Sequence, residues 1–470
     1  MATTRVERDP LGELRVPADA YYGVQTQRAI ENFPISGLRA PAPLVTATIL
    51  VKQACARANA SLGRLDAAVA EAVVQAADEI LSGRLRDQFV VDVYQAGAGT
   101  SHNMNANEVL ANRAAEILGE PRGTYARVHP NDHVNMGQST NDVFPTATRL
   151  AILLVLPGLL EAATALDTAL DVKAREYARV LKTGRTHLQD AVPITFGQAF
   201  GGYAANVRHA AEELRRSAEA LHELNLGATA VGTGLNAGED FTAAAIVNLS
   251  RATSLSLLPA RNRFRVTQSM GDVLAYSGSL RRLAVEVDKI ASDLRLLSSG
   301  PRAGLGEIQL PAVQPGSSIM PGKVNPSVPE MVNQVCQQVW GCDAAVLAAS
   351  AAGQLELNVM MPVIAWNALH ASMILASAMK VLTERTVEGL RADEARAREL
   401  LHRSTAVATA LSPYIGYEKT AEIAKEAVKT GRSIADIVRE RKLLPDAQLA
   451  AILSPEAMTS PGIPGKKTPR

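Results

Sequence analysis

The sequence predicts an all-α protein built around a bundle of long helices, and three observations support this prediction. Four segments, at about residues 144–180, 191–226, 240–299 and 327–390, carry apolar residues at three- and four-residue spacings and contain few helix-breaking residues. Aromatic residues make up only 4% of the chain, whereas alanine and aliphatic residues are plentiful. No region is rich in strand-forming patterns. Because the four segments are about two or three times as long as a typical helix, they favour a bundle of very long helices.

The character of the chain changes along its length. Residues 1–40 are expected to be irregular, because prolines and glycines recur there at the spacing of turns. Helical spacings begin at Pro41 and continue to Leu118, with a glycine-rich break at residues 97–100. The four long segments follow, and beyond Gly389 charged residues return with shorter helical patterns.

The charge and cysteine content exclude several classes of protein. Lys and Arg together number 48 and Asp and Glu 47, so the basic excess typical of nucleic-acid and membrane-surface proteins is absent from the sequence. The cysteines Cys55, Cys336 and Cys342 are too few and too scattered for a disulfide framework, which fits a reducing compartment.

The charged first residues predict no signal peptide. The most apolar run, residues 150–160, is about half a membrane span and contains Pro157. A soluble, cytoplasmic protein is expected.

The long helical segments also predict self-association. They are rich in small residues, which let helices approach closely, and their apolar faces are too extensive to face water. A bundle shared between identical subunits would bury these faces. The sequence therefore favours a homo-oligomer.

Residues 316–326 bring more reactive side chains together than any other short stretch. Glycine and proline lie at both ends and in the middle, so a loop with few allowed conformations is expected. The loop carries the hydroxyls of Ser317 and Ser318, the ammonium of Lys323 and the carboxamide of Asn325. Such a loop can hold a hydroxyl close to a cation, which stabilises an ionised hydroxyl or an anionic substrate. A tight turn with incidental serines is the alternative that composition alone leaves open.

Three other stretches, residues 97–105, 133–142 and 184–190, combine polar side chains with glycine or an abrupt break in the helical pattern. Their candidate binding residues are Thr100, Ser139, Thr140, Asn141, Thr186 and His187. Taken singly, each stretch is also compatible with a polar loop that caps a helix.

Together the four stretches predict a site for a small dicarboxylate. Hydroxyls and amides bind a carboxylate without a large net charge, and the helix expected to begin near Asn141 adds a dipole that favours an anion. Lys323 supplies a full positive charge. His187 is a candidate for acid–base chemistry, although a single histidine is more often structural. The sequence contains no H-E-x-x-H motif, Cys/His cluster or P-loop, so neither a catalytic metal nor a nucleotide cofactor is expected.

These stretches resemble the signature blocks of the fumarase/aspartase superfamily, in the order expected for it. The loop reads G-S-S-I-M-P-G-K-V-N-P, which is similar to the superfamily pattern G-S-S-x-M-P-x-K-x-N-P. Residues 19–26 and 227–236 are similar to two further blocks, and the resemblance runs from about Arg5 to Pro464. Enzymes of this superfamily cleave a C–N or C–O bond by β-elimination and typically release fumarate.

The resemblance implies an all-α protein of three domains. These are a mostly helical N-terminal domain of residues 1–138, a central long-helix bundle of residues 139–392 and a small helical C-terminal domain of residues 393–470. The resemblance also implies a homotetramer whose core is formed by the central helices. Each active site would then draw its blocks from three subunits.

The details of the blocks imply one branch of the superfamily. Ala98, Thr140 and residues 328–335 are similar to aspartases rather than to class II fumarases, whereas Met361 differs from the residue typical of either branch. The resemblance therefore implies reversible deamination of L-aspartate to fumarate and ammonium, and hydration of fumarate to L-malate is the alternative. A non-catalytic oligomer is a further alternative, which the joint presence of the polar residues disfavours.

The resemblance also implies roles for single residues. Ser317 is expected to act as the general base, with His187 and Lys323 as further catalytic residues. Glu330 is expected to orient His187. The residues expected to bind the substrate are Thr100, Ser139, Thr140, Asn141, Thr186, His187, Ser318, Lys323 and Asn325. The loop of residues 316–326 is expected to close over the substrate, because glycines lie on both sides of its serines.

Overall fold

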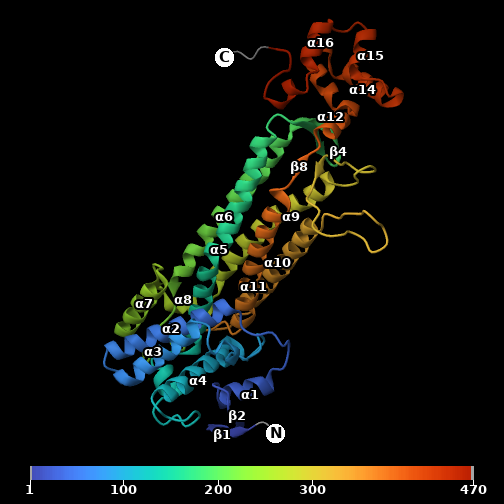
Figure 1. The fold of residues 1–470 in the computed structure, drawn as a ribbon. Coiled ribbons are helices and arrows are strands. Elements are labelled where there is room, and N and C mark those ends of the chain that lie inside the picture. Colours follow the sequence, from blue (N-terminus) through green and yellow to red (C-terminus); the bar gives the residue numbers. More distant parts are fainter. Residues whose placement is uncertain (1–2, 467–470) are drawn as a thin grey trace. The chain divides into compact units, whose positions relative to one another are not determined.

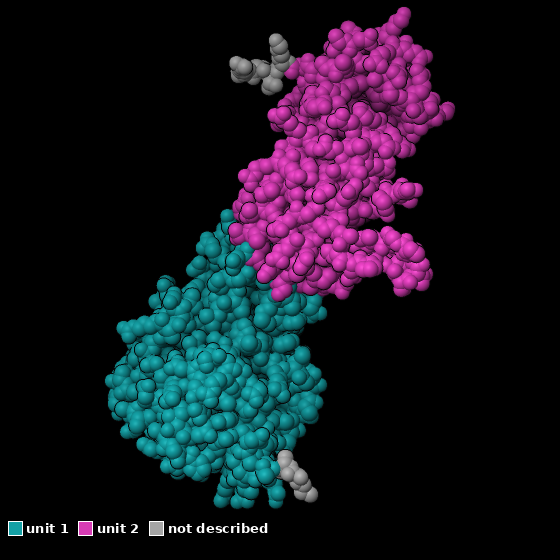
Figure 2. All heavy atoms as spheres, in the orientation of Figure 1, with its two compact units in different colours: residues 1–161, 211–284, 336–376 teal, residues 162–210, 285–335, 377–470 magenta. Residues whose placement is uncertain are grey.

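The computed structural model describes residues 3–466; residues 1–2 and 467–470, at the ends of the first and third expected domains, lie outside the described residues. The chain divides into two compact units (Figure 2). Unit 1 comprises Met1–Glu161, Ala211–Ala284 and Cys336–Ala376, and unit 2 comprises Ala162–Ala210, Val285–Val335 and Ser377–Arg470. Each unit is therefore built from three separate stretches of sequence. The three-domain division at residues 138/139 and 392/393 stays a prediction.

Helices form most of the structure, which confirms the predicted all-α class (Figure 1). The longest are α5 (Thr140–Glu176), α6 (Phe196–Ala218), α9 (Gly271–Leu297), α10 (Ser327–Ala351) and α11 (Met361–Leu382). Two prolines lie inside α5, Pro145 and Pro157.

Two of the expected long segments are divided. Residues 240–299 form three helices, α7 (Glu239–Thr253), α8 (Arg263–Gln268) and α9. The break begins at Ser254, which has a left-handed backbone (φ 58°), and it continues through a short strand that contains Pro259. Residues 327–390 are divided between α10 and α11 by the connection at residues 352–360. Periodicity alone did not locate these breaks, because the flanking residues continue the apolar spacing on both sides.

Polar contacts between the long helices occur within each unit. In unit 1, Arg149 of α5 forms an ion pair with Asp272 of α9 at 2.9 Å. In unit 2, Tyr203 of α6 donates a hydrogen bond of 2.6 Å to Asp293 of α9. Because the Arg149 side chain is fully buried, this cation needs its carboxylate partner to offset the loss of hydration.

The remaining elements of unit 1 lie mainly in the first 120 residues. They are β1 (Thr4–Asp9), β2 (Gly12–Pro17), α1 (Val24–Asn32), α2 (Ala42–Ser61), α3 (Ala67–Leu81), α4 (Thr100–Ile117), β5 (Glu223–Leu224) and β6 (Leu258–Pro259). A hydrophobic core of small and branched side chains joins α2, α3 and α4; its members include Ile49, Val73, Ile80, Val109 and Leu110. These alanine and aliphatic side chains thus pack as expected for closely spaced helices.

The expectation that residues 1–40 are irregular is wrong. Residues of β1 and β2 pair in an antiparallel hairpin that extends from Thr4 opposite Pro17 to Asp9 opposite Gly12. This hairpin is not apparent from apolar alternation, because the inward-facing residue of β1 is Glu7, which is 3% exposed.

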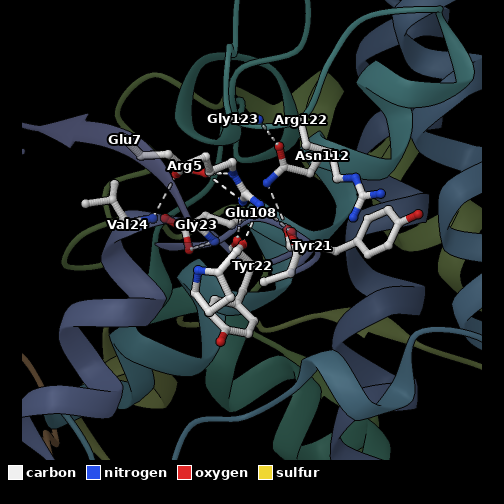
Figure 3. Close-up of polar contacts among 12 residues, drawn as sticks. Arg5, Glu7, Tyr21, Tyr22, Gly23, Val24, Glu108, Asn112, Arg122 and Gly123 are labelled. Atoms are coloured by element: carbon white, nitrogen blue, oxygen red, sulfur yellow. Dashed lines mark hydrogen bonds and ion pairs between the residues drawn. The ribbon is translucent and has the colours of Figure 1, made fainter. Parts of the chain in front are cut away.

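Two buried carboxylates bind the start of α1 (Figure 3). Glu108 of α4 accepts hydrogen bonds from the backbone N–H groups of Gly23, Gln25 and Thr26 at 2.8–3.0 Å. Glu7 accepts the N–H of Val24 at 2.9 Å. A helix start leaves four N–H groups without intrahelical partners, and here each of them reaches a carboxylate, whose charge also suits the helix dipole.

The surroundings of these carboxylates explain why they are stable in the core. Arg5 forms an ion pair with Glu7 at 2.7 Å, and the Tyr125 hydroxyl donates to Glu7 at 2.9 Å. Burial raises the pKa of Glu108 to about 6, although the three N–H groups act in the opposite direction. Gly23 is required here, because a Cβ at this position would lie 2.2 Å from the Tyr125 hydroxyl oxygen.

Glu108→Gln is expected to lower the free energy of unfolding by about 2–3 kcal/mol. Glutamine keeps the size of the side chain, but one of its ends is an NH₂ group that would face a backbone N–H. Urea unfolding at pH 7 measures the change. Glu71→Gln, on the exposed surface of α3, is the matched control and should change stability by less than about 0.5 kcal/mol. Equal stability of the two variants would contradict the proposed capping role.

Unit 2 contains the C-terminal elements, the β3–β4 hairpin and the antiparallel pairing of β7 with β8, which are distant in sequence. Its shorter elements are β3 (Leu181–Thr186), β4 (Gln189–Thr195), β7 (Ile308–Gln309), β8 (Arg391–Ala392), α12 (Glu394–Arg403), α13 (Ser412–Ile415), α14 (Tyr417–Thr430), α15 (Ile434–Glu440) and α16 (Asp446–Ile452). The C-terminal helices have a hydrophobic core of their own, which includes Leu411, Ile423, Ile437 and Leu449. The strands of the described residues make four two-stranded sheets.

Two helical stretches, Thr140–Glu176 and Met361–Val387, are long and apolar enough to cross a membrane by length and composition alone. In their most apolar windows, 56% and 61% of the residues are buried inside the protein. The core helices of a helical bundle have the same composition, because they contact other helices on most of their surface. The apolar run at residues 150–160 belongs to α5, in agreement with the long helical segment predicted at residues 144–180.

Candidate active site

Residues 316–326 form a loop in unit 2, as predicted, and its two ends are joined through Gly316. The Gly316 N–H donates to the carbonyl oxygen of Lys323 at 2.8 Å. The Asn325 side-chain amide donates to the carbonyl oxygen of Gly316, also at 2.8 Å. A Cβ at position 316 would lie 2.6 Å from that Lys323 oxygen, so glycine is needed for this close approach. The loop thus brings the residue before Ser317 against the backbone of Lys323.

The Ser317 hydroxyl oxygen accepts two backbone hydrogen bonds from within the loop. The N–H groups of Ile319 and Met320 donate to it at 3.2 Å and 2.9 Å. Both donors would favour an ionised oxygen over a neutral hydroxyl, because they place positive partial charge next to it. Ser317 is half-buried, whereas Ser318 and Lys323 are exposed. The loop therefore holds the Ser317 oxygen where two N–H groups would stabilise its ionised form.

A cavity of about 690 Å³ lies beside the end of this loop in unit 2. Three predicted site residues, Lys323, Asn325 and Glu330, contribute to its lining together with Arg295. Arg295 also donates to Asn333 at 2.9 Å. The cations Lys323 and Arg295 outnumber the single carboxylate, Glu330, in this lining, and the positive excess favours an anionic ligand.

Thr186 and His187 lie at the tip of the hairpin formed by β3 and β4. His187 and Leu188 connect the strands, and both have positive φ angles of 56° and 58°. Two-residue connections of this kind usually contain Asn or Gly, since other residues are strained there. Arg185, next to the tip, forms an ion pair of 2.7 Å with the fully buried Glu307. The hairpin therefore holds an exposed histidine in a strained but well-supported position.

Thr100 is the first residue of α4 in unit 1, at the end of a turn made by left-handed residues. Ala98 has φ 60° and Gly99 has φ 84°. The Ala98 N–H donates to the carbonyl oxygen of Val359 at 2.8 Å, which attaches this turn to the segment that precedes α11. The glycine-rich break predicted at residues 97–100 is therefore a sharp turn that leaves Thr100 exposed.

Gly99→Ala is expected to lower the free energy of unfolding by about 3 kcal/mol or more. The new Cβ would lie 2.2 Å from the Phe144 ring, and the residue would keep a φ that alanine disfavours. Gly119→Ala is the matched control, because Gly119 has nearly the same φ (82°) but no heavy atom within 4 Å of the added Cβ. The control should cost about 1–2 kcal/mol. Denaturant unfolding of both variants separates the contact with Phe144 from the backbone effect.

Ser139, Thr140 and Asn141 form the start of α5 in unit 1. The Ser139 hydroxyl accepts the Asn141 N–H at 3.2 Å, and the Asp142 carboxylate accepts the Ser139 N–H at 2.9 Å. This reciprocal arrangement is a capping box. It confirms that a helix N-terminus lies at the predicted dicarboxylate-binding block.

Asp142 also connects this block to residues 227–236. Its second carboxylate oxygen accepts the N–H groups of Gly227 and Thr229 at 3.0 Å and 2.9 Å. The Asn141 side chain donates to the carbonyl oxygen of Ala230 at 2.8 Å. Burial raises the pKa of Asp142 to about 6, and its three N–H donors act in the opposite direction. Asp142 was not among the predicted site residues, although the S-x-x-D spacing before an apolar run was a signal for its capping role.

The starts of α4 and α5 lie against each other. Asn103, one turn after Thr100, donates a hydrogen bond of 3.1 Å to the Thr140 hydroxyl. A Cβ on Gly99 would meet Phe144, one turn after Thr140. Unit 1 therefore brings together the blocks that contain Thr100 and Ser139–Asn141.

The predicted site residues fall into two groups. Thr100, Ser139, Thr140 and Asn141 belong to unit 1, and Thr186, His187, Ser317, Ser318, Lys323, Asn325 and Glu330 belong to unit 2. Within the described residues, no hydrogen bond or ion pair joins His187 to Glu330. The orientation of His187 by Glu330 stays a prediction. The expected sharing of each site between subunits would let the His187 of one subunit meet the Glu330 of another.

Met361 is fully buried at the first position of α11 in unit 1. The residue that departs from the superfamily pattern is therefore an apolar core residue at this position. Among residues 3–466, no group of three or more His, Cys, Asp and Glu side chains could hold a metal ion.

Comparisons with known proteins identify the family of this chain. Residues 12–341 match the model of the family described as Lyase, and residues 407–460 match that of the Fumarase C C-terminus. An aspartate ammonia-lyase of Pseudomonas aeruginosa is 50% identical, with 98% of each chain covered. A class II fumarate hydratase of Halobacterium salinarum is 51% identical, also with 98% of each chain covered.

The fold comparison gives the same result. The crystal structure of a fumarate lyase:delta crystallin from Brucella melitensis superposes with a TM-score of 0.93 and 50% identity. It covers 98% of this chain and all of that one. The family match over most of the chain, the shared fold and the signature loop lead to one conclusion: this chain belongs to the lyase family of fumarases and aspartases.

Proposed function

We propose that this protein is an aspartate ammonia-lyase, which converts L-aspartate to fumarate and ammonium by β-elimination. The observation that carries the proposal is the loop of residues 316–326, in which two backbone N–H groups donate to the Ser317 hydroxyl oxygen. Relatives named aspartate ammonia-lyase, 48–50% identical over nearly the whole chain, support this choice of reaction.

In the proposed reaction, Ser317 removes a proton from Cβ of L-aspartate. A serine hydroxyl is a poor base unless its alkoxide is stabilised, and the N–H groups of Ile319 and Met320 supply part of that stabilisation. Lys323 adds a positive charge on the same loop. The electron pair of the broken C–H bond passes into the β-carboxylate and gives a dianionic aci-carboxylate. Its return forms the C=C bond as the protonated amino group leaves Cα as ammonia, and the proton taken by Ser317 is then released to give ammonium and restore the base.

The proposed substrate contacts follow the chemistry of each group. Thr100, Ser139, Thr140 and Ser318 surround the β-carboxylate, which gains charge in the transition state. Lys323, Asn325 and Thr186 bind the α-carboxylate, and Asn141 and His187 contact the amino group. The α5 dipole adds to the stabilisation of the β-carboxylate, since the hydroxyls of Ser139 and Thr140 lie at the helix start.

We also propose a cytoplasmic homotetramer with active sites shared between subunits. The division of the site residues between units 1 and 2 of one chain is compatible with such sharing. Each site would then combine the α5 start of one subunit with loop residues 316–326 and the His187 hairpin of others. The small dicarboxylate is the expected partner, and no nucleic acid or membrane is expected.

Fumarate formation from L-aspartate and from L-malate, followed in parallel by ultraviolet absorbance, tests the proposed reaction. Fumarate and an equal amount of ammonium from L-aspartate are expected. A class II fumarate hydratase is the second candidate, because one such enzyme is 51% identical to this chain. Fumarate from L-malate alone would establish that alternative. Product from neither substrate would refute both and leave a lyase that acts on another amine-bearing succinate, or the non-catalytic oligomer.

A further inference from the structure

Lys52 of α2 is a fully buried cation beneath the proposed carboxylate-binding block of unit 1. Its ammonium donates to the side-chain oxygens of Asn135 and Gln138 at 2.8 Å and 2.9 Å. Both acceptors are neutral amides, so no carboxylate forms a direct ion pair with this charge in the described contacts. Burial lowers the pKa of Lys52 to about 7, with Asp142 acting in the opposite direction. A buried ammonium is costly to the fold, and such a cost points to a specific role.

Asn135 connects Lys52 to α4. Its side-chain oxygen also accepts hydrogen bonds from the amides of Asn103 and Asn107, at 3.3 Å and 3.2 Å. The amide of Asn103 donates in addition to the Thr140 hydroxyl at 3.1 Å. Lys52, Asn135, Asn103 and Thr140 therefore form a continuous series of hydrogen-bonded side chains, which we call the Lys52–Thr140 chain.

The direction of these hydrogen bonds determines how Thr140 can act. Because its oxygen accepts the Asn103 N–H, its own proton points to another acceptor. Threonines inside helices commonly donate to the carbonyl oxygen four residues before, as Thr148 does to Phe144 at 2.9 Å. Thr140 is the first residue of α5, so no carbonyl of that helix lies four residues before it. Its proton therefore has no acceptor within α5 and can be donated to a ligand at the helix start, although Thr140 is only 9% exposed in the single chain.

We propose that Lys52 is a positioning residue: through the Lys52–Thr140 chain, it holds the Thr140 hydroxyl as a hydrogen-bond donor to the substrate carboxylate. This inference rests on the proposed function of the site. The cation polarises Asn135, whose oxygen then holds the amide group of Asn103 in the orientation that donates to Thr140. Asp142 holds the adjacent backbone by its three N–H contacts, so a buried cation and a buried anion support the same helix start.

The test compares Lys52→Met, Thr140→Val and the double variant in the full-length protein. Succinate is the probe, because it is a dicarboxylate without an amino group to eliminate. Its dissociation constant is measured by calorimetry, and kcat and KM are measured with L-aspartate. Each single variant is expected to weaken succinate about tenfold or more, as for a lost hydrogen bond to a charged group. In the Thr140→Val background, Lys52→Met should weaken it by less than about twofold further.

Two further variants separate positioning from a general effect on the fold. Lys173→Met removes another mostly buried lysine, one that pairs with Glu176 at 2.8 Å, and should leave succinate affinity unchanged. Asn103→Ala breaks the Lys52–Thr140 chain without removing the cation. It should reproduce the loss of affinity and its dependence on Thr140, and it serves if Lys52→Met does not fold.

The outcomes distinguish the inference from the proposed reaction. Independent, multiplicative effects of the Lys52 and Thr140 variants would overturn the inference, even if the wild type deaminates L-aspartate. Absence of succinate binding by the wild type would also overturn it. Lys52-dependent succinate binding without any deamination would retain the inference and refute the aspartate reaction.

Discussion

Ser317→Ala is expected to lower kcat for fumarate formation from L-aspartate by about a thousandfold or more, as for the loss of a general base. The hydroxyl oxygen is the atom proposed to take the Cβ proton, and alanine supplies no replacement. The fold should be unaffected, since Ile319 and Met320, whose N–H groups donate to Ser317, are both exposed and can bind water instead. Initial rates at saturating L-aspartate measure the effect.

Two further measurements make the Ser317 result specific: the succinate affinity of the same variant, and the activity of a variant at a control serine. Succinate affinity should change by less than about threefold, because Ser317 is assigned to proton transfer and a group acting only in the transition state contributes little to binding. Ser82→Ala removes a hydroxyl at the end of α3, where Ser82 donates to the Glu79 carbonyl at 2.7 Å, and it should retain full activity. Turnover by Ser317→Ala equal to that of the wild type would refute the assignment of the base.

Lys323→Met is expected to lower kcat/KM by about a hundredfold or more, because the loop loses the proposed contact to the α-carboxylate and the positive charge proposed to stabilise the Ser317 alkoxide. The variant tests the ammonium alone, because the loop is closed by the backbone carbonyl of Lys323 and not by its side chain. Succinate should also bind more weakly, since Lys323 is proposed to contact the carboxylate that does not react. Steady-state kinetics and calorimetry measure the two effects.

Charge and position can be separated for Lys323. Lys323→Arg keeps the positive charge and should recover part of the lost kcat/KM, although its planar group has a different reach. Lys419→Met removes an exposed cation from α14 and should have no effect. If Lys419→Met and Lys323→Met were equally active, the cation of the loop would have no part in catalysis.

Several features of the site were predictable because their signals are local in sequence. Glycine and proline restrict the backbone around residues 316–326, so a loop was predicted and found. Ser139, Thr140 and Asn141 are typical of a helix start, and α5 begins at Thr140. The long apolar periodicities predicted helices, but their extents were wrong at Ser254, at residues 352–360 and at residues 191–195, which belong to strand β4.

The buried charged groups of unit 1 were not predictable in this way. Glu7, Glu108 and Lys52 are charged residues in segments whose spacing gives no reason to bury them, and the spacing of Asp142 indicated a helix cap but not its burial. Each is buried because its partners come from distant parts of the chain, such as Gly23 for Glu108 and Gly227 for Asp142. A charge is stable in the core only where such partners satisfy it, and their positions follow from the packing of whole helices.

The sequence by itself therefore determined the helical class, the polar blocks and, by resemblance, the family. These depend on local backbone preferences and on residue identities that are read directly from the chain. Only the tertiary structure decided that Lys52 reaches Thr140 through amides, and that Glu108 and Asp142 bind backbone N–H groups of distant segments. Hydrogen bonds have strict requirements of distance and angle, and residues far apart in sequence meet those requirements only after the helices have packed.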